Sequence, residues 1–257
     1  MAKRPNLYDY LKIVAVITMI IDHLWYYFFP DQIWMRLVGR IAFPIFLFLV
    51  GFSNSYKRRR DIVIMASIIQ ISMWLGYHYA HIGTFQLNIL WAIIGVRLFL
   101  RRYQYYHKYR LLFIISIMLL GMHFAIESWI DYGMLSWFLG IFGFLVRKKI
   151  HQKDDSSFDI YLLLYGIFTI ITILIYNIVQ FRFWNFDVGH RISWIHLGFY
   201  PLLLYIFFLL WQQNYILHSN KKRDSCIVFV SRNALLIYGM HLFLLSLIKW
   251  LFISQGI

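Results

Sequence analysis

Hydrophobic residues in this chain come in blocks of roughly 17 to 25, separated by short polar stretches, which is the length that a helix needs to cross a bilayer. Strands of a membrane β-barrel would instead alternate in polarity over about ten residues, and the sequence has no such alternation. The pattern predicts an all-α, polytopic integral membrane protein with about nine transmembrane helices. The expected spans cover residues 7–29, 36–55, 61–77, 87–100, 111–126, 132–146, 158–180, 192–213 and 226–252.

Two prolines define the first two spans more closely. Pro30 is expected to close the first span and Pro44 to kink the second, where neighbouring helices can satisfy the freed carbonyl group. The first span is too long for a signal peptide and lacks a small-residue cleavage site, so we expect it to be retained. Because no linker rich in Pro, Gly or Ser interrupts the chain, residues 1–257 are predicted to form one transmembrane domain.

Composition supports a lipid environment and predicts an orientation. Apolar residues make up 61% of the chain and charged residues only 14%, which leaves too little polar surface to coat a soluble protein. Most cations behind the net charge of +14 lie in alternate short loops, which are expected to face the cytoplasm and anionic lipid headgroups. We therefore predict a multi-pass protein of the cell membrane, with a cytoplasmic N-terminus and an extracytoplasmic C-terminus. Nucleic acid binding is not expected, because it requires a continuous basic face.

The first expected helix carries ionisable residues inside an apolar segment, namely Asp9, Lys12, Asp22 and His23. At about 100° per residue, Asp9, Lys12 and His23 lie within about 60° of one another on one face. A rise of about 1.5 Å per residue separates Lys12 from His23 by roughly 16 Å. This spacing suits a long ligand with an anionic head near Lys12 and a reactive tip near His23. The structural alternative is that Lys12 reaches the inner headgroups and His23 is a hydrogen-bonded packing residue.

The last expected helix contains a second polar group, formed by Arg232, Tyr238 and His241. His241 lies about 22 Å from the inner end of this helix, close to the depth of His23, so the two histidines are expected to share a layer. Arg232 and His241 fall on opposite faces of an ideal helix. They can serve one cavity only if the helix bends, and Gly239 is the expected point.

Residues near the ends of other spans allow further kinds of site. Arg36 and Arg40 are spaced i, i+4 before an apolar run, so they share a helical face at the outer edge of the membrane. There they either bind headgroups or contact an anion at a substrate entrance. His78 and His81 have a spacing that could hold a metal, but no Asp, Glu or Cys lies nearby to complete the ligands. We therefore expect no metal site.

The first fifth of the chain contains a distinctive combination of motifs. A Lys-initiated apolar helix ends in the pair Asp22 and His23, Pro30 follows, and the second helix opens with GRIAFPIF at residues 39–46. This combination resembles the TraX-like family of membrane acyltransferases. The spacing of ten residues between Lys12 and His23 is similar to the basic-x10-His signature of acyltransferase type 3 proteins. The Asp-His ending also resembles heparan-α-glucosaminide N-acetyltransferase, and the C-terminal RNALLIYGMHLFLLSLI is similar to the closing helix of these families.

The resemblance implies transfer of an acyl group, usually acetyl from cytoplasmic acetyl coenzyme A, to an amine or hydroxyl acceptor at the outer face. In this interpretation Lys12 meets the phosphates of coenzyme A. His23 is the catalytic residue beside the thioester, either as a general base or as a transiently acylated nucleophile. Asp22 joins the catalytic group by orienting a neighbouring helix or a water molecule. The residues expected to complete the donor site are Arg36, Arg40 and Arg232, and those expected at the acceptor site are Asp9, Tyr238 and His241.

The acceptor and the class of function stay open at this point. A peptide, a cell-envelope glycan and a lipid-linked sugar all offer a suitable amine or hydroxyl, so N- and O-acylation are both compatible with the sequence. A transporter or lipid flippase is the main alternative, because such proteins also place charges around a midplane site. It would show an inverted repeat between the two halves of the chain, and we find none in the sequence. A non-catalytic membrane subunit would leave Lys12 and His23 without a purpose.

Overall fold

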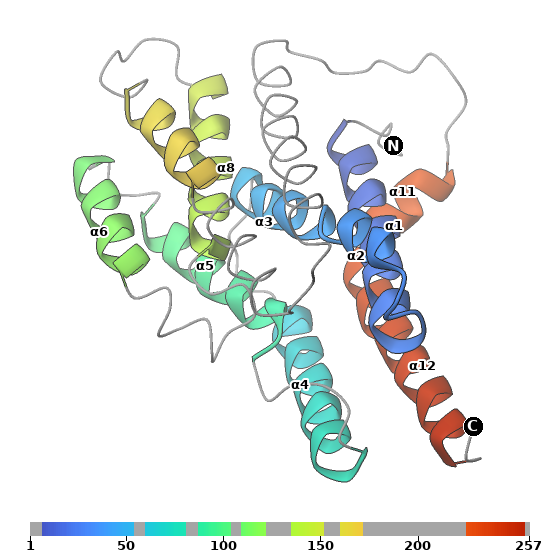
Figure 1. Cartoon of the computed structure of the whole chain (residues 1–257). Coiled ribbons are helices and arrows are strands. Elements are labelled where there is room, and N and C mark those ends of the chain that lie inside the picture. Colours follow the sequence, from blue (N-terminus) through green and yellow to red (C-terminus); the bar gives the residue numbers. More distant parts are fainter. Residues whose placement is uncertain are drawn as a thin grey trace.

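The chain is almost entirely helical wherever the computed structural model describes it (Figure 1). The described residues are 7–53, 60–80, 87–103, 109–121, 135–151, 160–171 and 225–254. Every expected span within these ranges coincides with one helix or with two consecutive helices, so the prediction of an all-α protein is confirmed for them. The expected span 192–213 lies outside the described residues.

Among the described residues, three helical segments are long and apolar enough to cross a membrane: Tyr8–Phe28, Trp34–Phe52 and Ala234–Phe252. The others are shorter or more polar. For example, α6 (Tyr109–Gly121) has 13 residues and therefore rises only about 20 Å, while α5 (Ile89–Tyr103) has 15 residues and includes three arginines. The described part of the chain therefore supports a membrane protein with three candidate spans rather than nine.

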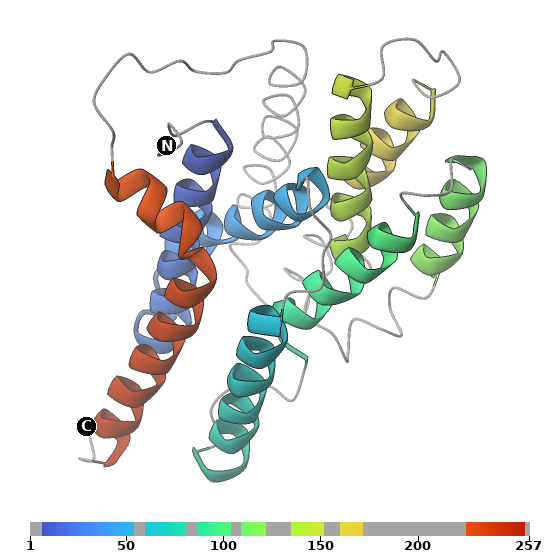
Figure 2. The same ribbon diagram turned by 180° about the vertical axis from the view of Figure 1, so that it is seen from behind.

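One group of helices is built around α1 (Leu7–Phe28). Its partners are α2 (Ile33–Gly39), α11 (Ser225–Arg232) and α12 (Ala234–Ser254). Although α1 and α12 are far apart in sequence, the front and back views both show them side by side (Figures 1 and 2). The first and last described helices are thus neighbours.

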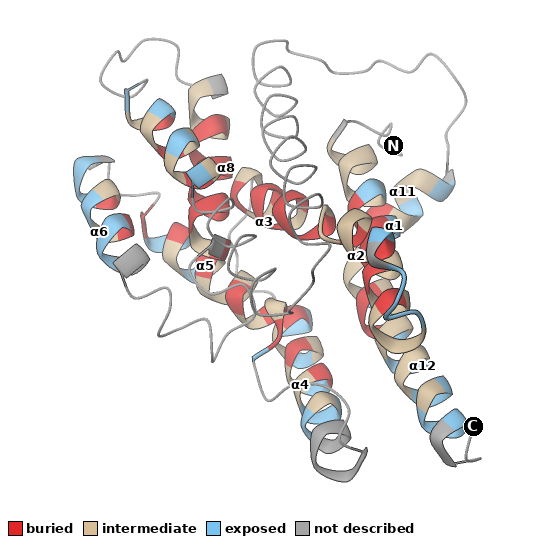
Figure 3. Cartoon of the chain, in the orientation of Figure 1, coloured by how far each residue is buried: buried red, intermediate tan, exposed pale blue. Residues whose placement is uncertain are grey.

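A second group of helices is connected to the first through α3 (Ala42–Phe52), which packs against both α1 and α8 (Leu135–His151). α5 packs against α3 and α8, and α4 (Arg60–Ala80) contacts both α5 and α12. The α3–α8 contact is a close approach of two backbones, because a Cβ atom added at Gly143 would overlap the backbone of Phe48. The large buried side chains gather here, whereas apolar side chains on the outer faces are exposed, as suits contact with lipid (Figure 3).

Both expected interruptions by proline are found. α1 ends at Phe28, and the carbonyl group of Pro30 accepts a hydrogen bond from Nε1 of Trp25 at 2.9 Å. α2 and α3 are separated at Arg40 and Ile41, four and three residues before Pro44. Pro44 has no N–H to donate to the carbonyl group of Arg40, and its ring would clash with that carbonyl group in a continuous helix. The break between α2 and α3 therefore lies one turn before Pro44, as proline requires.

Candidate functional site

A row of polar contacts, which we call the polar seam, joins α1 to α11 and α12. The polar seam comprises Asp9, Lys12, His23 and Tyr27 of α1, Ser231 of α11, and His241, Ser246 and Lys249 of α12. Residue numbers rise together along the two sides of the seam, so α1 and α12 run parallel. The N-terminal end of α1 and the C-terminal end of α12 therefore lie at opposite ends of the seam (Figure 1). Which end faces the cytoplasm stays a prediction.

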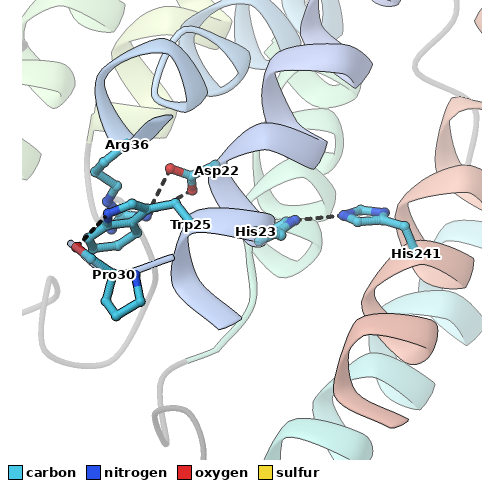
Figure 4. Close-up of polar contacts among 6 residues, drawn as sticks. All are labelled: Asp22, His23, Trp25, Pro30, Arg36 and His241. Atoms are coloured by element: carbon cyan, nitrogen blue, oxygen red, sulfur yellow. Dashed lines mark hydrogen bonds and ion pairs between the residues drawn. The ribbon is translucent and has the colours of Figure 1, made fainter. Parts of the chain in front are cut away.

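His23 and His241 face each other between the two ends of the polar seam (Figure 4). Nδ1 of His23 lies 2.6 Å from Nε2 of His241, and the ring centroids are 4.9 Å apart. The buried ring of Tyr238 lies beside them, with its centroid 6.1 Å from that of His23 and 5.9 Å from that of His241. The prediction that the two histidines share a layer is confirmed, and Tyr238 belongs to the same cluster.

The hydrogen-bonded imidazole groups of His23 and His241 have the chemical capacity for catalysis as well as for packing. Nδ1 of His241 also lies 2.7 Å from the carbonyl oxygen of Ile237, so both nitrogens of this ring are hydrogen-bonded. A partly buried imidazole held by a neighbour can accept a proton, return it, or attack an electrophilic carbon. The catalytic role of His23 itself stays a prediction.

Asp22 points away from the histidine pair and toward α2 (Figure 4). Nη1 of Arg36 donates to both carboxylate oxygens of Asp22 at 2.9 Å, and the guanidinium carbon lies 4.6 Å from the ring centroid of Trp25. A Cβ atom added at Gly39 would overlap Asp22, so α2 approaches α1 closely here. Asp22 thus orients a neighbouring helix, as expected, and Arg36 is its partner. A contact between Arg36 and a donor molecule stays a prediction.

Arg40 lies at the C-terminal end of α2 and is partly buried. It directly follows Gly39, where α2 approaches Asp22 of α1 closely. The end of α2 thus brings a second arginine to the part of α1 that carries Asp22 and His23. The expected role of Arg40 toward the donor stays a prediction.

Lys12 lies near one end of the polar seam, and because α1 is one continuous helix it is about 16 Å from His23. Its Nζ donates to the carbonyl group of Ser231 at 3.3 Å and lies 4.6 Å from the ring centroid of Tyr8. The hydroxyl of Ser231 donates to the Asp9 carboxylate at 2.5 Å. Lys12 and Asp9 therefore bind the start of α1 to α11, at the separation from His23 that the sequence predicts.

Comparison with known proteins gives this helical chain a family. The family model described as TraX protein matches residues 8–249. This chain belongs to the TraX family. An uncharacterized protein of Rickettsia prowazekii (strain Madrid E) is 27% identical over 258 residues, which cover 95% of this chain and 93% of that protein. Protein TraX of Escherichia coli (strain K12) is 32% identical over 93 residues, which cover 34% of this chain and 36% of that protein.

The predicted resemblance to the TraX family is thus confirmed, while the more distant resemblances to acyltransferase type 3 proteins and to heparan-α-glucosaminide N-acetyltransferase stay predictions. No solved structure matches the chain.

The last helix of this TraX family member bends at Asn233, between α11 and α12, and the expectation of a bend at Gly239 is wrong. The backbone N–H of Asn233 and its side-chain Nδ2 both donate to the carbonyl group of Phe229, at 3.0 and 2.8 Å. Gly239 lies inside α12, buried against Met65 of α4. The side chain of Arg232 is exposed, and no hydrogen bond among the described residues joins it to the histidine pair.

Sequence reasoning missed several members of the site. The missed residues are Trp25, Tyr27, Ser231, Ser246 and Lys249. Tyr27 had a usable signal, because it follows His23 by one helical turn and so lies on the same face. The described residues contain no group of three or more His, Cys, Asp or Glu side chains that could hold a metal. His81 and the side chain of His78 lie outside the described part of the structure.

Proposed function

We propose that this TraX family member is a membrane-embedded acyltransferase, which moves an acyl group, usually acetyl, from cytoplasmic acyl coenzyme A to an amine or hydroxyl at the outer face. The contact between His23 and His241 carries the proposal. It lies between two helices that are each long and apolar enough to span a membrane. Polar groups at such positions are costly and typically serve a pathway or a reaction. Family membership supports the proposal, because the matched residues 8–249 include both histidines.

The imidazole of His23 would act by one of two balanced routes. As a general base, it takes the proton of the acceptor N–H or O–H while the acceptor attacks the thioester carbon. The C–S bond then breaks, and the coenzyme A thiolate receives the proton. As a nucleophile, the ring nitrogen forms a bond to the acyl carbon and expels the thiolate. The acceptor then attacks the acyl-imidazole, the bond from the acyl carbon to the ring nitrogen breaks, and the acceptor proton passes to the thiolate. Both routes end in an amide or ester and free coenzyme A.

The two ends of the donor would meet different parts of α1. Acetyl coenzyme A carries phosphates at one end and the thioester at the other, separated by a flexible arm. Lys12 supplies a cation for the phosphates, roughly 16 Å along the helix from His23. Arg40, which follows Gly39 at the close approach of α2 to Asp22, would meet an anionic part of the donor or the acceptor near the reacting carbon. Coenzyme A would therefore lie along α1.

The test is turnover of radiolabelled acetyl coenzyme A by the purified protein in detergent. Release of free thiol and transfer of label would be followed with a panel of acceptors: a peptide with a free N-terminus, glucosamine and a lipid-linked sugar. His23→Ala should lower turnover by about 100-fold or more, because loss of a general base removes that much rate. Tyr27→Phe is the matched control, since it removes the hydrogen bond to Ser246 in the same helix pair without touching the histidines. Equal turnover of wild type and His23→Ala would contradict the proposal, and absence of any turnover would favour a transporter.

A further inference from the structure

His241 holds one ring proton in a defined position. Its Nδ1 lies 2.7 Å from the carbonyl oxygen of Ile237, one turn earlier in α12. A carbonyl oxygen only accepts hydrogen bonds, so Nδ1 of His241 must carry the proton. In a neutral imidazole the other nitrogen, Nε2, then has a lone pair and no proton.

The same logic passes from His241 to His23. Nε2 of His241 lies 2.6 Å from Nδ1 of His23. Because Nε2 of His241 is the acceptor, Nδ1 of His23 must be the donor. The second nitrogen of a neutral His23, Nε2, is therefore left with the lone pair. Two hydrogen bonds in series thus assign the tautomer of both rings.

The surroundings favour neutral rings. If both rings were imidazolium, each would present an N–H to the other, and the 2.6 Å contact would have no acceptor. A single imidazolium inside a membrane span requires an anionic partner. The Asp22 carboxylate already accepts two hydrogen bonds from Arg36, and no hydrogen bond among the described residues joins either ring to a carboxylate.

We propose that His241 is a positioning residue, which fixes the tautomer of His23 so that Nε2 of His23 is the atom that reacts. The inference rests on the acyl transfer proposed above and specifies its reacting atom. In the general-base route, Nε2 of His23 takes the acceptor proton. In the nucleophilic route, it forms the bond to the acyl carbon as the C–S bond breaks. In both routes the ring becomes positively charged, and the lone pair of His241 stabilises that charge through the Nδ1–H hydrogen bond.

Contacts on both sides of the histidine pair hold His241 at the required height. Toward one end of the polar seam, Ser231 bonds Asp9. Toward the other end, Nζ of Lys249 donates to the backbone carbonyl group of Tyr27 at 2.9 Å. These contacts restrict sliding of α12 along α1, so the imidazole of His241 stays opposite that of His23.

Two substitutions of His241 separate the role of the acceptor from that of volume. In His241→Gln the amide oxygen can accept the Nδ1–H of His23, whereas His241→Leu fills the space with no acceptor. We expect His241→Gln to keep kcat within about three-fold of wild type, and His241→Leu to lower kcat by about ten-fold or more at an unchanged KM for acetyl coenzyme A. Gly95→Ala, on α5 and with nothing within 4 Å of the added Cβ atom, should leave kcat at the wild-type value.

A spectroscopic readout tests the tautomer without turnover. In nanodiscs, nuclear magnetic resonance of 15N-labelled histidine should show the ring proton of wild-type His23 on Nδ1, and in His241→Leu a shift of that proton toward Nε2. A wild-type proton on Nε2, or equal kcat for wild type and His241→Leu, would overturn the inference. Absence of turnover in the wild type, with the proton on Nδ1, would instead refute the acyl transfer while leaving the assigned tautomer standing.

Discussion

Replacing Asp22 by Asn tests how strongly the ion pair with Arg36 holds α2 against α1. Asn has nearly the same shape, so the change removes the charge and leaves the Arg36 guanidinium without its counter-ion. Only 10% of the Asp22 side chain and 18% of the Arg36 side chain are exposed. Removing one partner of a buried ion pair costs about 3–5 kcal/mol, and the partial exposure of Arg36 favours the lower end, about 3 kcal/mol.

Thermal unfolding of the purified protein in detergent measures this loss. At about 2–4 °C per kcal/mol for a chain of this size, Asp22→Asn should lower Tm by about 6–12 °C. Combining Asp22→Asn with Arg36→Met removes both charges, so the double variant should regain at least about half of that loss. A Tm for Asp22→Asn within about 2 °C of wild type would refute the reasoning. So would a double variant as unstable as the sum of the two single variants.

Two further predictions use matched pairs of residues. Gly39→Ala should lower the free energy of unfolding by about 1–3 kcal/mol, because the new Cβ atom overlaps Asp22. Gly95→Ala has nothing within 4 Å of the added atom and should raise the free energy of unfolding by up to about 1 kcal/mol. Similar Tm values for the two variants would contradict this prediction. Lys12→Met should weaken coenzyme A binding about ten-fold, measured as a smaller Tm increase with coenzyme A. Lys249→Met removes a similar amine-to-carbonyl contact at the other end of the polar seam and should keep the full increase in Tm with coenzyme A. An equally reduced Tm increase in both variants would count against a donor site at Lys12.

The shared layer of His23 and His241 could be predicted from the sequence because it depends on helical rise alone. α1 is continuous from Leu7 to Phe28, so the depth of His23 follows from its position in the chain. The bend at Asn233 comes before His241 and keeps the hydrogen bond from the N–H of Ile237 to the carbonyl group of Asn233, so little rise is lost. The membership of Tyr27 in the polar seam was equally accessible, since it lies one turn after His23.

Other features depend on tertiary geometry that periodicity does not encode. The pairing of Asp22 with Arg36 requires the turn between α1 and α2 to bring residues 14 positions apart together, and no helical spacing implies that contact. The bend of the last helix depends on Asn233, whose side-chain amide donates to the Phe229 carbonyl group and so competes with the backbone hydrogen bonds of the helix. A search for glycine does not find such a position. Within the described part of the chain, three helical segments rather than each apolar block have the length and composition of a membrane span, because apolar blocks do not show where a helix begins and ends.

The most direct measurement of the central claim is acetyl transfer across a reconstituted bilayer. Proteoliposomes would hold the acceptor panel inside and receive radiolabelled acetyl coenzyme A outside, with wild type, His23→Ala and Tyr27→Phe compared at equal protein content. The account predicts labelled acceptor inside the vesicles for wild type and Tyr27→Phe. For His23→Ala it predicts a labelling rate that is lower by about 100-fold or more. Labelling by His23→Ala at the wild-type rate would contradict the proposal that acyl transfer in this TraX family member proceeds through His23.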